Sequence, residues 1–146
     1  MIEVYVSDVH FPDHDPAAWK LARKVLREVG PDLIFLGGDI MEFKAISRHY
    51  KSPQEELDFH LEIDYGVKEL TKLRNEHPNA KIEFLPGNHE TIRLQKYIAS
   101  TGKALFKLPA LTIPELLKFK RNEIIDHEYK SAPKIGKLTH IHGDEI

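Results

Sequence analysis

The sequence predicts an α/β fold in which a mostly parallel β-sheet is flanked by helices. Short runs of apolar and β-branched residues alternate with segments of helical periodicity, and the run over residues 33–36 is apolar throughout, as in a strand covered on both faces. Four runs, over residues 2–7, 33–36, 82–85 and 137–141, end directly at polar side chains. Because ligands bind outside the carboxyl ends of parallel strands, we expect these four ends to converge on one site.

The composition fits one folded domain spanning residues 1–146. The chain is 41% hydrophobic and 30% charged, and the absence of cysteine leaves His, Asp, Glu and Asn as metal ligands. No window approaches the roughly 18 uninterrupted apolar residues of a membrane span, and the chain starts with a strand pattern rather than a leader. We therefore expect a cytoplasmic protein without a membrane partner. The net charge of -2 does not indicate a nucleic-acid groove, although a bound metal pair would make the local field positive and so leaves nucleic acid open as a substrate.

The first predicted strand, residues 2–7, ends at Asp8 and His10. Two residues apart in an extended chain, their side chains point to the same side, as joint coordination of one cation requires. The alternative is a turn aspartate followed by a surface histidine. For an Asp-x-His pair taken alone, this alternative is favoured.

A crossover helix is expected after the first strand. Asp15 and Pro16 form a helix-start signal, and Gly30 followed by Pro31 ends the helix. The residues expected to be buried lie at helical spacing: Ala18, Leu21, Ala22, Val25 and Val29.

The second strand, residues 33–36, leads to a glycine pair and an aspartate. Gly37 and Gly38 let the backbone turn tightly, which brings Asp39 beside Asp8 and His10. Asp39 is therefore the candidate bridge between two metals.

A loop with a short helical piece over residues 43–49 is expected next. Its Arg48 and His49 either face substrate or, as we favour, are solvated. A capping box over residues 52–55 then predicts a long helix to about Glu76, with His60 and His77 at the surface or the helix end. The buried stripe of this helix is expected to comprise Phe59, Ile63, Val67, Leu70 and Leu73.

The third strand, residues 82–85, stops at Pro86 and Gly87, and Asn88 and His89 follow at the start of a helix. A second capping box is expected over residues 112–115. Residues 122–129 are expected to form an extended edge segment in which Asp126 and His127 are solvated. The last strand, residues 137–141, is expected to end at His142.

Four motifs, each after a predicted strand, now stand in a fixed order: Asp8-x-His10, Gly38-Asp39, Gly87-Asn88-His89-Glu90 and His142-Gly143. In this combination the sequence resembles the calcineurin-like metallophosphoesterase family, over nearly the whole chain. The stretch from Gly37 to Phe43, followed by Ser47-Arg48, is also similar to small single-domain members from bacteria and phages.

The resemblance implies a metallophosphoesterase-like sandwich that hydrolyses phosphoesters with two divalent metal ions. Asp8 and His10 would hold the first ion, Asp39 would bridge, and Asn88 with His142 would hold the second. Asp39 and His89 would be the catalytic residues, with His89 over the phosphate to stabilise charge or protonate the leaving alkoxide. Such nitrogen and oxygen ligands suit manganese, iron or zinc, with manganese favoured. Two cations roughly 3.5–4 Å apart would activate a water molecule.

The family pattern also includes a later Gly-His-x-His motif, which supplies one more histidine to each metal. The chain has only His140-x-His142, with Thr139 in the place of the glycine, and the role of His140 stays open. The resemblance therefore implies a C-terminally incomplete domain without its last strands and with weakened activity. An exposed sheet edge would follow, which self-association could cover.

Three functions are compatible with these residues. A phosphatase or phosphodiesterase is preferred. A nuclease would use the same metals but needs a positive groove with aromatic platforms, which the sequence does not show. A non-catalytic metal-binding remnant of the fold would differ from both in its metal content per chain.

Overall fold

The computed structural model describes residues 1–48 and 58–143. Its main sheet has four parallel strands in the order β1 (Glu3–Val6), β2 (Leu33–Leu36), β3 (Lys81–Phe84) and β4 (Ile124–Asp126). The register aligns Val4 with Ile34, Ile34 with Ile82 and Ile82 with Ile124. All four carboxyl ends therefore lie along one edge of the sheet, and the predicted α/β class with a parallel sheet flanked by helices is confirmed.

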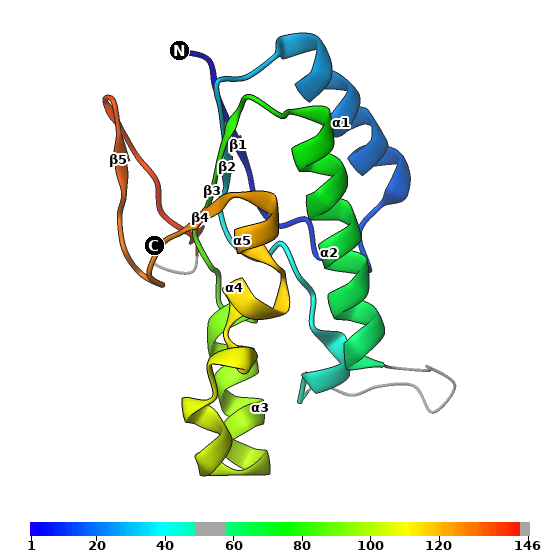
Figure 1. Ribbon diagram of the computed structural model, residues 1–146, viewed down its shortest axis with the longest axis vertical. Helices are drawn as coiled ribbons and strands as arrows, with labels where there is room; N and C mark the ends of the chain where they lie inside the picture. Colours follow the sequence, from blue (N-terminus) through cyan, green and yellow to red (C-terminus); the bar gives the residue numbers. More distant parts are fainter. Residues whose placement is uncertain (49–57, 144–146) are drawn as a thin grey trace.

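The two long helices α1 (Pro16–Val29) and α2 (Phe59–Glu76) lie on the same side of the sheet, whereas the small sheet of β5 (Lys134–Ile135) and β6 (Leu138–Thr139) lies on the other (Figure 1). Alternate residues along a strand point to opposite faces, which separates an apolar core from a more polar second face. Four side chains of the core, Ile34, Leu36, Ile82 and Phe84, are almost completely buried.

The prediction of a parallel strand over residues 137–141 is wrong. Within this range, Leu138–Thr139 pairs antiparallel with β5 in a separate two-stranded sheet. Gly136 between the two strands has a φ of +60°, a conformation that glycine adopts without steric cost, so the chain turns back on itself. The fourth parallel strand is instead β4, at the sheet edge and inside the segment 122–129 that was expected to be extended.

Helix α1 begins and ends as predicted, but its buried face is different. The Asp15 carboxylate accepts hydrogen bonds from the backbone of Ala17 and Ala18, and Gly30 ends the helix in the left-handed conformation. Trp19 and Leu26 are the buried residues, whereas Leu21 is 61% exposed. The buried stripe expected for this helix, Ala18, Leu21, Ala22, Val25 and Val29, lines an open groove beside β1.

This apolar stripe of α1 is exposed because β1 lies at the edge of the sheet, where no described strand pairs with its outer side. Helical periodicity shows that a stripe is apolar but not what it packs against. Self-association over this edge stays a prediction.

Helix α2 begins at Phe59, later than predicted. Asp58 is its N-cap, with a carboxylate that accepts hydrogen bonds from the backbone of His60 and Leu61. The expected capping box over residues 52–55 and His49 lie outside the described residues. Leu70 and Leu73 are buried as predicted, and the helix ends at Glu76 as expected.

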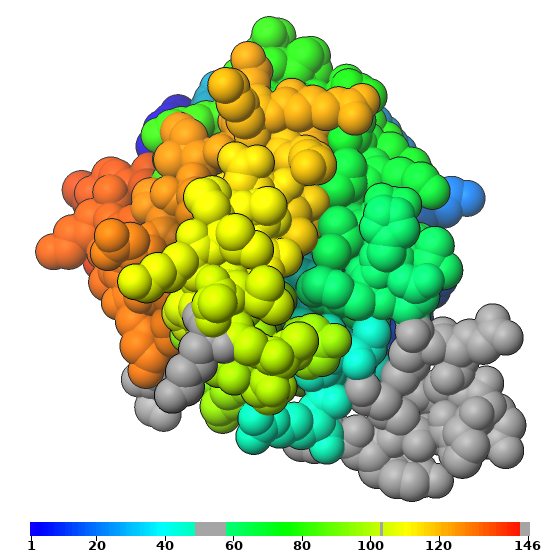
Figure 2. Space-filling view, turned by 60° about the horizontal axis from the view of Figure 1, so that its bottom comes forward, coloured from blue at the N-terminus to red at the C-terminus, as the bar shows by residue number. Residues whose placement is uncertain are grey.

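Short helices complete the described chain: η1 (Lys44–Ile46), the π-helical turn η2 (His89–Arg93), α3 (Leu94–Thr101), η3 (Lys103–Lys107), η4 (Pro109–Leu111), α4 (Ile113–Leu116) and α5 (Phe119–Asn122). Figure 2 shows α3 and the segment after it at one end of the molecule, between α2 and the later residues drawn in orange. The predicted capping box at α4 is wrong, because the Thr112 hydroxyl donates to the Pro109 carbonyl instead of capping the helix. In the part of the chain described here, none of the helices has both the length and the apolar character needed to cross a bilayer.

Candidate metal centre

The loops that follow β1 and β2 run side by side beyond the ends of the strands. The backbone N–H of Asp8 donates to the Gly38 carbonyl at 3.0 Å, and that of His10 donates to the Asp39 carbonyl at 3.0 Å. Gly38 has a φ of +89°, and a Cβ atom there would lie 2.5 Å from Nδ1 of His142. Glycine at this position therefore permits both the turn and the close approach of the histidine.

Three of the predicted metal ligands have a left-handed backbone. Their φ values are +54° for Asp8, +59° for His10 and +49° for Asp39. Such conformations are uncommon outside glycine, cost on the order of 1–3 kcal/mol each, and cluster at functional sites. Among the described residues, four other non-glycine residues also have positive φ: Phe43, Lys118, Glu123 and Lys130. This strain is therefore consistent with a functional site but does not identify it alone.

A buried carboxylate holds the loops after β2 and β3 together. Glu90 is 1% exposed. One of its oxygens accepts hydrogen bonds from the backbone of Asp39 and Gly87, at 3.0 and 2.9 Å, and the other accepts from Met41 at 2.8 Å. Burial and the charge of Asp39 raise the pKa of Glu90 above its usual value, and the hydrogen bonds from Met41 and Gly87 offset this only in part. Glu90 thus fixes the frame on which the site residues stand.

Asp39 lies between two groups of potential ligands. Its Oδ1 accepts a hydrogen bond from the backbone N–H of His89 at 2.9 Å, which fixes the orientation of the carboxylate. The other oxygen, Oδ2, lies 3.5 Å from Nε2 of His142 and 3.8 Å from Nε2 of His89. This geometry is suited to a bridging ligand.

The first group contains Asp8, Asp39 and His142, whose potential ligand atoms lie within 4.8 Å of one another. Nδ1 of His142 lies 3.0 Å from the Gly37 carbonyl, and because a carbonyl only accepts, Nδ1 carries a proton. In the neutral ring, Nε2 then directs a lone pair at Asp39 Oδ2 and at Asn88 Oδ1, which is 3.2 Å away. A cation would satisfy all three atoms, so the donor set fits a metal.

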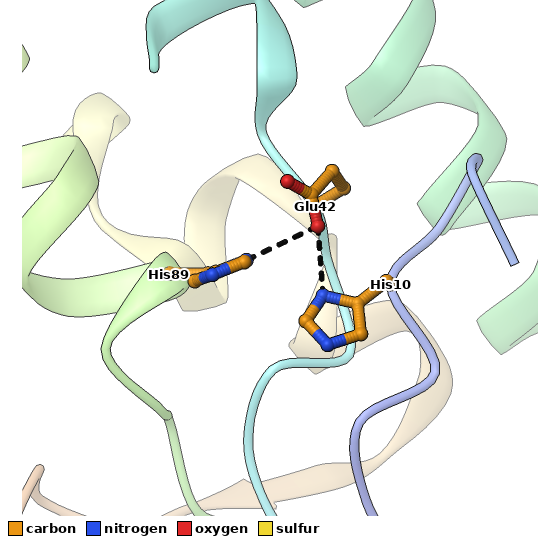
Figure 3. Close-up of side chains that lie close together, drawn as sticks. All are labelled: His10, Glu42 and His89. Carbon is orange, nitrogen blue, oxygen red and sulfur yellow. Dashed lines mark ion pairs between the residues drawn. The ribbon is translucent and has the colours of Figure 1, made fainter. Parts of the chain in front are cut away.

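The second group contains His10, Glu42 and His89, which converge from three different loops (Figure 3). Glu42 Oε2 lies 2.8 Å from Nδ1 of His10 and 3.4 Å from Nδ1 of His89. Burial alone would raise the pKa of Glu42, but hydrogen bonds from His89 and Arg93 outweigh burial and lower the pKa to about 2. Glu42 is therefore a carboxylate at any ordinary pH.

Arg93 completes this second group. Its guanidinium donates to Glu42 Oε1 at 2.8 Å and to the Glu42 carbonyl, and Nη2 lies 2.8 Å from Nε2 of His89. Burial and the charge of Arg93 lower the pKa of His89, but the Glu42 carboxylate 3.4 Å from Nδ1 and the charge of Asp39 raise it above its usual value overall. Glu42 and Asp39 thus favour the protonated ring of His89, whereas the Arg93 guanidinium, which can only donate, requires an unprotonated Nε2.

All five predicted ligands lie at this edge of the sheet, but they are grouped differently than expected. His10 was expected beside Asp8, whereas it faces Glu42 and His89. The expectation assumed an extended chain, in which alternate side chains share a side, and the left-handed backbone at Asp8 and His10 breaks that alternation. His142 contacts Asn88, as expected, but it also groups with Asp8 and Asp39.

Sequence reasoning missed three residues of the site: Glu42, Glu90 and Arg93. Glu42 stands three residues after Asp39, and Glu90 directly follows His89. Arg93 lies four residues after His89, a spacing that places both side chains on one face of a helix. This spacing was the available signal for Arg93. Glu90 ends the motif Gly87-Asn88-His89-Glu90, but its burial depends on long-range packing and could not be read from the motif.

The fold and the site define an α/β protein with a candidate metal centre at the carboxyl ends of its parallel strands. The family model of the calcineurin-like phosphoesterases matches residues 4–145, nearly the whole chain, and the chain belongs to this family. Membership implies a metal-dependent phosphoester hydrolase in general, since the family typically binds divalent metals. A comparison with curated proteins found no match.

Proposed function

We propose that this protein is a phosphatase or phosphodiesterase that uses two divalent metal ions, with manganese favoured. The observation that carries the proposal is that the potential ligand atoms of Asp8, Asp39 and His142 lie within 4.8 Å of one another, beside a second group that contains His10 and Glu42. A carboxylate between these two groups, such as that of Asp39, could be shared by a pair of cations. Nitrogen and oxygen donors without thiolates suit manganese, iron and zinc.

Five residues would hold the two ions: Asp8, His10, Asp39, Asn88 and His142. Bound there, the ions would activate a water molecule and neutralise charge on the attacking and leaving oxygens. Asp39 has its orientation fixed by the backbone of His89, so the carboxylate needs little rearrangement to bind both ions.

His89 would act on the substrate rather than on the metals. Glu42 and Asp39 favour its protonated ring, so His89 would donate a proton from Nε2 to the leaving alkoxide once the phosphate has displaced Arg93 from that nitrogen. Arg93, whose Nη2 lies 2.8 Å from His89 Nε2, would bind the non-bridging oxygens of the phosphate as a charged donor. A phosphate between these two side chains would separate them and occupy the space over the metal pair.

The lining of a neighbouring cavity favours a small ester over a nucleic acid. This cavity, of about 330 Å³, starts at Pro86 and Glu90 and is lined by apolar residues of α3 and of the short helices after it. Among the described residues that line it, none is a lysine or arginine. A polynucleotide backbone would require cationic side chains along its path.

The test is hydrolysis by manganese-loaded protein of an alkyl phosphate, an aryl phosphate, an aryl phosphodiester and a single-stranded oligonucleotide. We expect His89→Ala to lower turnover of a poor-leaving-group ester by roughly 10²–10⁴-fold, the range for losing a general acid, and turnover of an aryl ester by less. Metal content should stay unchanged. The matched control is His60→Ala, which removes an exposed histidine of α2 and should keep full activity.

Three outcomes would count against the proposal. Cleavage of the oligonucleotide alone would identify a nuclease. Two bound metals without hydrolysis of any ester would identify a non-catalytic protein. Equal losses on both leaving groups in His89→Ala would assign the residue to charge stabilisation instead of proton donation.

A further inference from the structure

His140 lies two residues before His142 but belongs to neither ligand group. It is 5% exposed and lies on the face of the sheet opposite α1 and α2, where its ring stacks on Phe35 of β2 with the ring centres 4.2 Å apart and the planes at 19°. Nε2 of His140 lies 2.6 Å from Oε1 of Glu3. Neither atom has a hydrogen-bond partner among the described residues, so each is the nearest polar neighbour of the other in this buried place.

Tyr5 makes a second link between this segment and the metal centre. Its hydroxyl lies 3.0 Å from the Ile141 carbonyl and 3.1 Å from the Gly37 carbonyl, and its single proton can be donated to one of them at a time. A Cβ atom at Gly37 would lie 1.9 Å from the hydroxyl oxygen, so glycine leaves the space that the hydroxyl fills. The same Gly37 carbonyl accepts the hydrogen bond from Nδ1 of His142.

The hairpin before His142 offers little packing of its own. Its strands β5 and β6 have two residues each, both residues of β6 are exposed, and Leu138 is 58% exposed. The buried contacts of His140 and the hydroxyl of Tyr5 therefore add to the hydrogen bond between His142 and Gly37 in attaching residues 140–142 to the sheet.

We infer that Glu3, Tyr5 and His140 form a clasp that positions His142 as a metal ligand. This inference rests on the proposed metal centre. His140 is a positioning residue in this account and not itself a ligand, because within the described residues no third metal-ligating side chain gathers with Glu3 and His140. The clasp places His142 against Gly37 and thereby fixes which ring nitrogen faces Asp39.

The same face of the sheet provides a matched control. His127 also stacks on Phe35, with ring centres 5.7 Å apart, and its Nε2 lies 2.5 Å from Oε2 of the buried Glu83. Replacing either histidine by alanine removes an imidazole from Phe35 and leaves a carboxylate without its histidine partner. Only His140 is followed by a residue of the candidate metal centre.

The experiment measures the affinity of each manganese ion for wild type, His140→Ala and His127→Ala, after thermal denaturation has shown that each is folded. We expect His140→Ala to weaken binding of the ion held by Asp8, Asp39 and His142 by about 10–100-fold, the usual effect of losing a partner behind a ligand. His127→Ala should bind both ions as wild type does. Tyr5→Phe, which removes one hydroxyl, should weaken binding of the same ion by about 2–10-fold. This variant replaces His140→Ala in the test if His140→Ala does not fold.

Two further readouts distinguish positioning from general destabilisation. In metal-free protein, nitrogen NMR of His142 should show a fixed Nδ1–H form in wild type and in His127→Ala, and a mixture of forms in His140→Ala. The double variant Glu3→Leu/His140→Phe, which rebuilds the contact with Phe35 from apolar groups, should recover most of the lost affinity.

Equal manganese affinities in wild type and His140→Ala would overturn the clasp and leave the proposed function standing. Equal losses in His140→Ala and His127→Ala would also overturn it, since the effect would then be one of stability. Wild type that binds no manganese would overturn the metal centre and the clasp together.

Discussion

The ends of β2 and β4 carry the same residue type in different settings. After β2, Asp39 is 6% exposed, has a φ of +49°, and receives a hydrogen bond from the backbone of His89. At the end of β4, Asp126 is an exposed residue whose carboxyl lies at the wall of a cavity. Partial burial of this carboxyl raises the pKa of Asp126 to about 6, although the charge of His127 acts in the opposite direction.

This comparison shows that a polar residue at a strand end becomes part of a site only where neighbouring loops converge. The ends of β1, β2 and β3 are tied to one another by backbone hydrogen bonds and by the Glu90 carboxylate. His127, next to Asp126, contacts Glu83 instead, on the face of the sheet opposite α1 and α2. The prediction that His127 is solvated is therefore wrong.

The largest expected effect separates the two aspartates directly. Asp39→Asn removes the charge that the two proposed cations would share, so metal-dependent hydrolysis should fall by more than the roughly 10²–10³-fold that loss of one charge-stabilising donor costs. Asp126→Asn should be nearly silent. Turnover of an aryl phosphate with added manganese is the measurement, and comparable activities would show that the site is misplaced.

A second prediction concerns what holds the end of β2 in place. Glu90→Ala leaves the buried N–H groups of Asp39, Met41 and Gly87 without an acceptor, at about 1–3 kcal/mol for each unsatisfied group. The free energy of unfolding of metal-free protein should fall by at least about 2 kcal/mol. Denaturant unfolding is the measurement, with exposed Glu115→Ala as the control that should change it by less than about 0.5 kcal/mol. Similar midpoints in the two variants would refute a framing role for Glu90.

The smallest expected effect is on the titration of His89. The negative charge of Glu42 stabilises the protonated ring, so Glu42→Gln should lower the pKa of His89 in metal-free protein. Burial and the charge of Arg93, which both lower that pKa, would remain. Nitrogen NMR titration is the measurement, with exposed His60 as the internal reference. A pKa that stays unchanged or rises would mean that Glu42 does not support proton donation.

Much of the fold could be predicted from local sequence signals. The strands β1, β2 and β3 and the ends of α1 follow from apolar runs and from capping residues such as Asp15 and Gly30, because these signals act within a few residues. The convergence of Asp39 and Asn88 could be predicted because parallel strands bring their carboxyl ends together.

The remaining features depend on long-range packing. The apolar face of α1 gave no information on its partner, and Leu21 lies in an open groove while Leu26 is buried. The left-handed backbone at Asp8 and His10 accompanies hydrogen bonds to the neighbouring loop. The direction of the His10 side chain toward Glu42 could therefore not be predicted from the alternation of side chains along an extended strand. His142 reaches the centre from a hairpin rather than from a parallel strand, held by contacts that join residues more than 100 positions apart.

The central claim is that Asp39 is shared by two cations, and metal content per chain tests it most directly. Protein purified without chelator, loaded with manganese and freed of excess ion should contain two ions per chain by elemental analysis. The Asp39→Asn variant should contain at most one, while Asp126→Asn should keep two. An absence of manganese from the wild type after loading, or two ions in Asp39→Asn, would contradict the account.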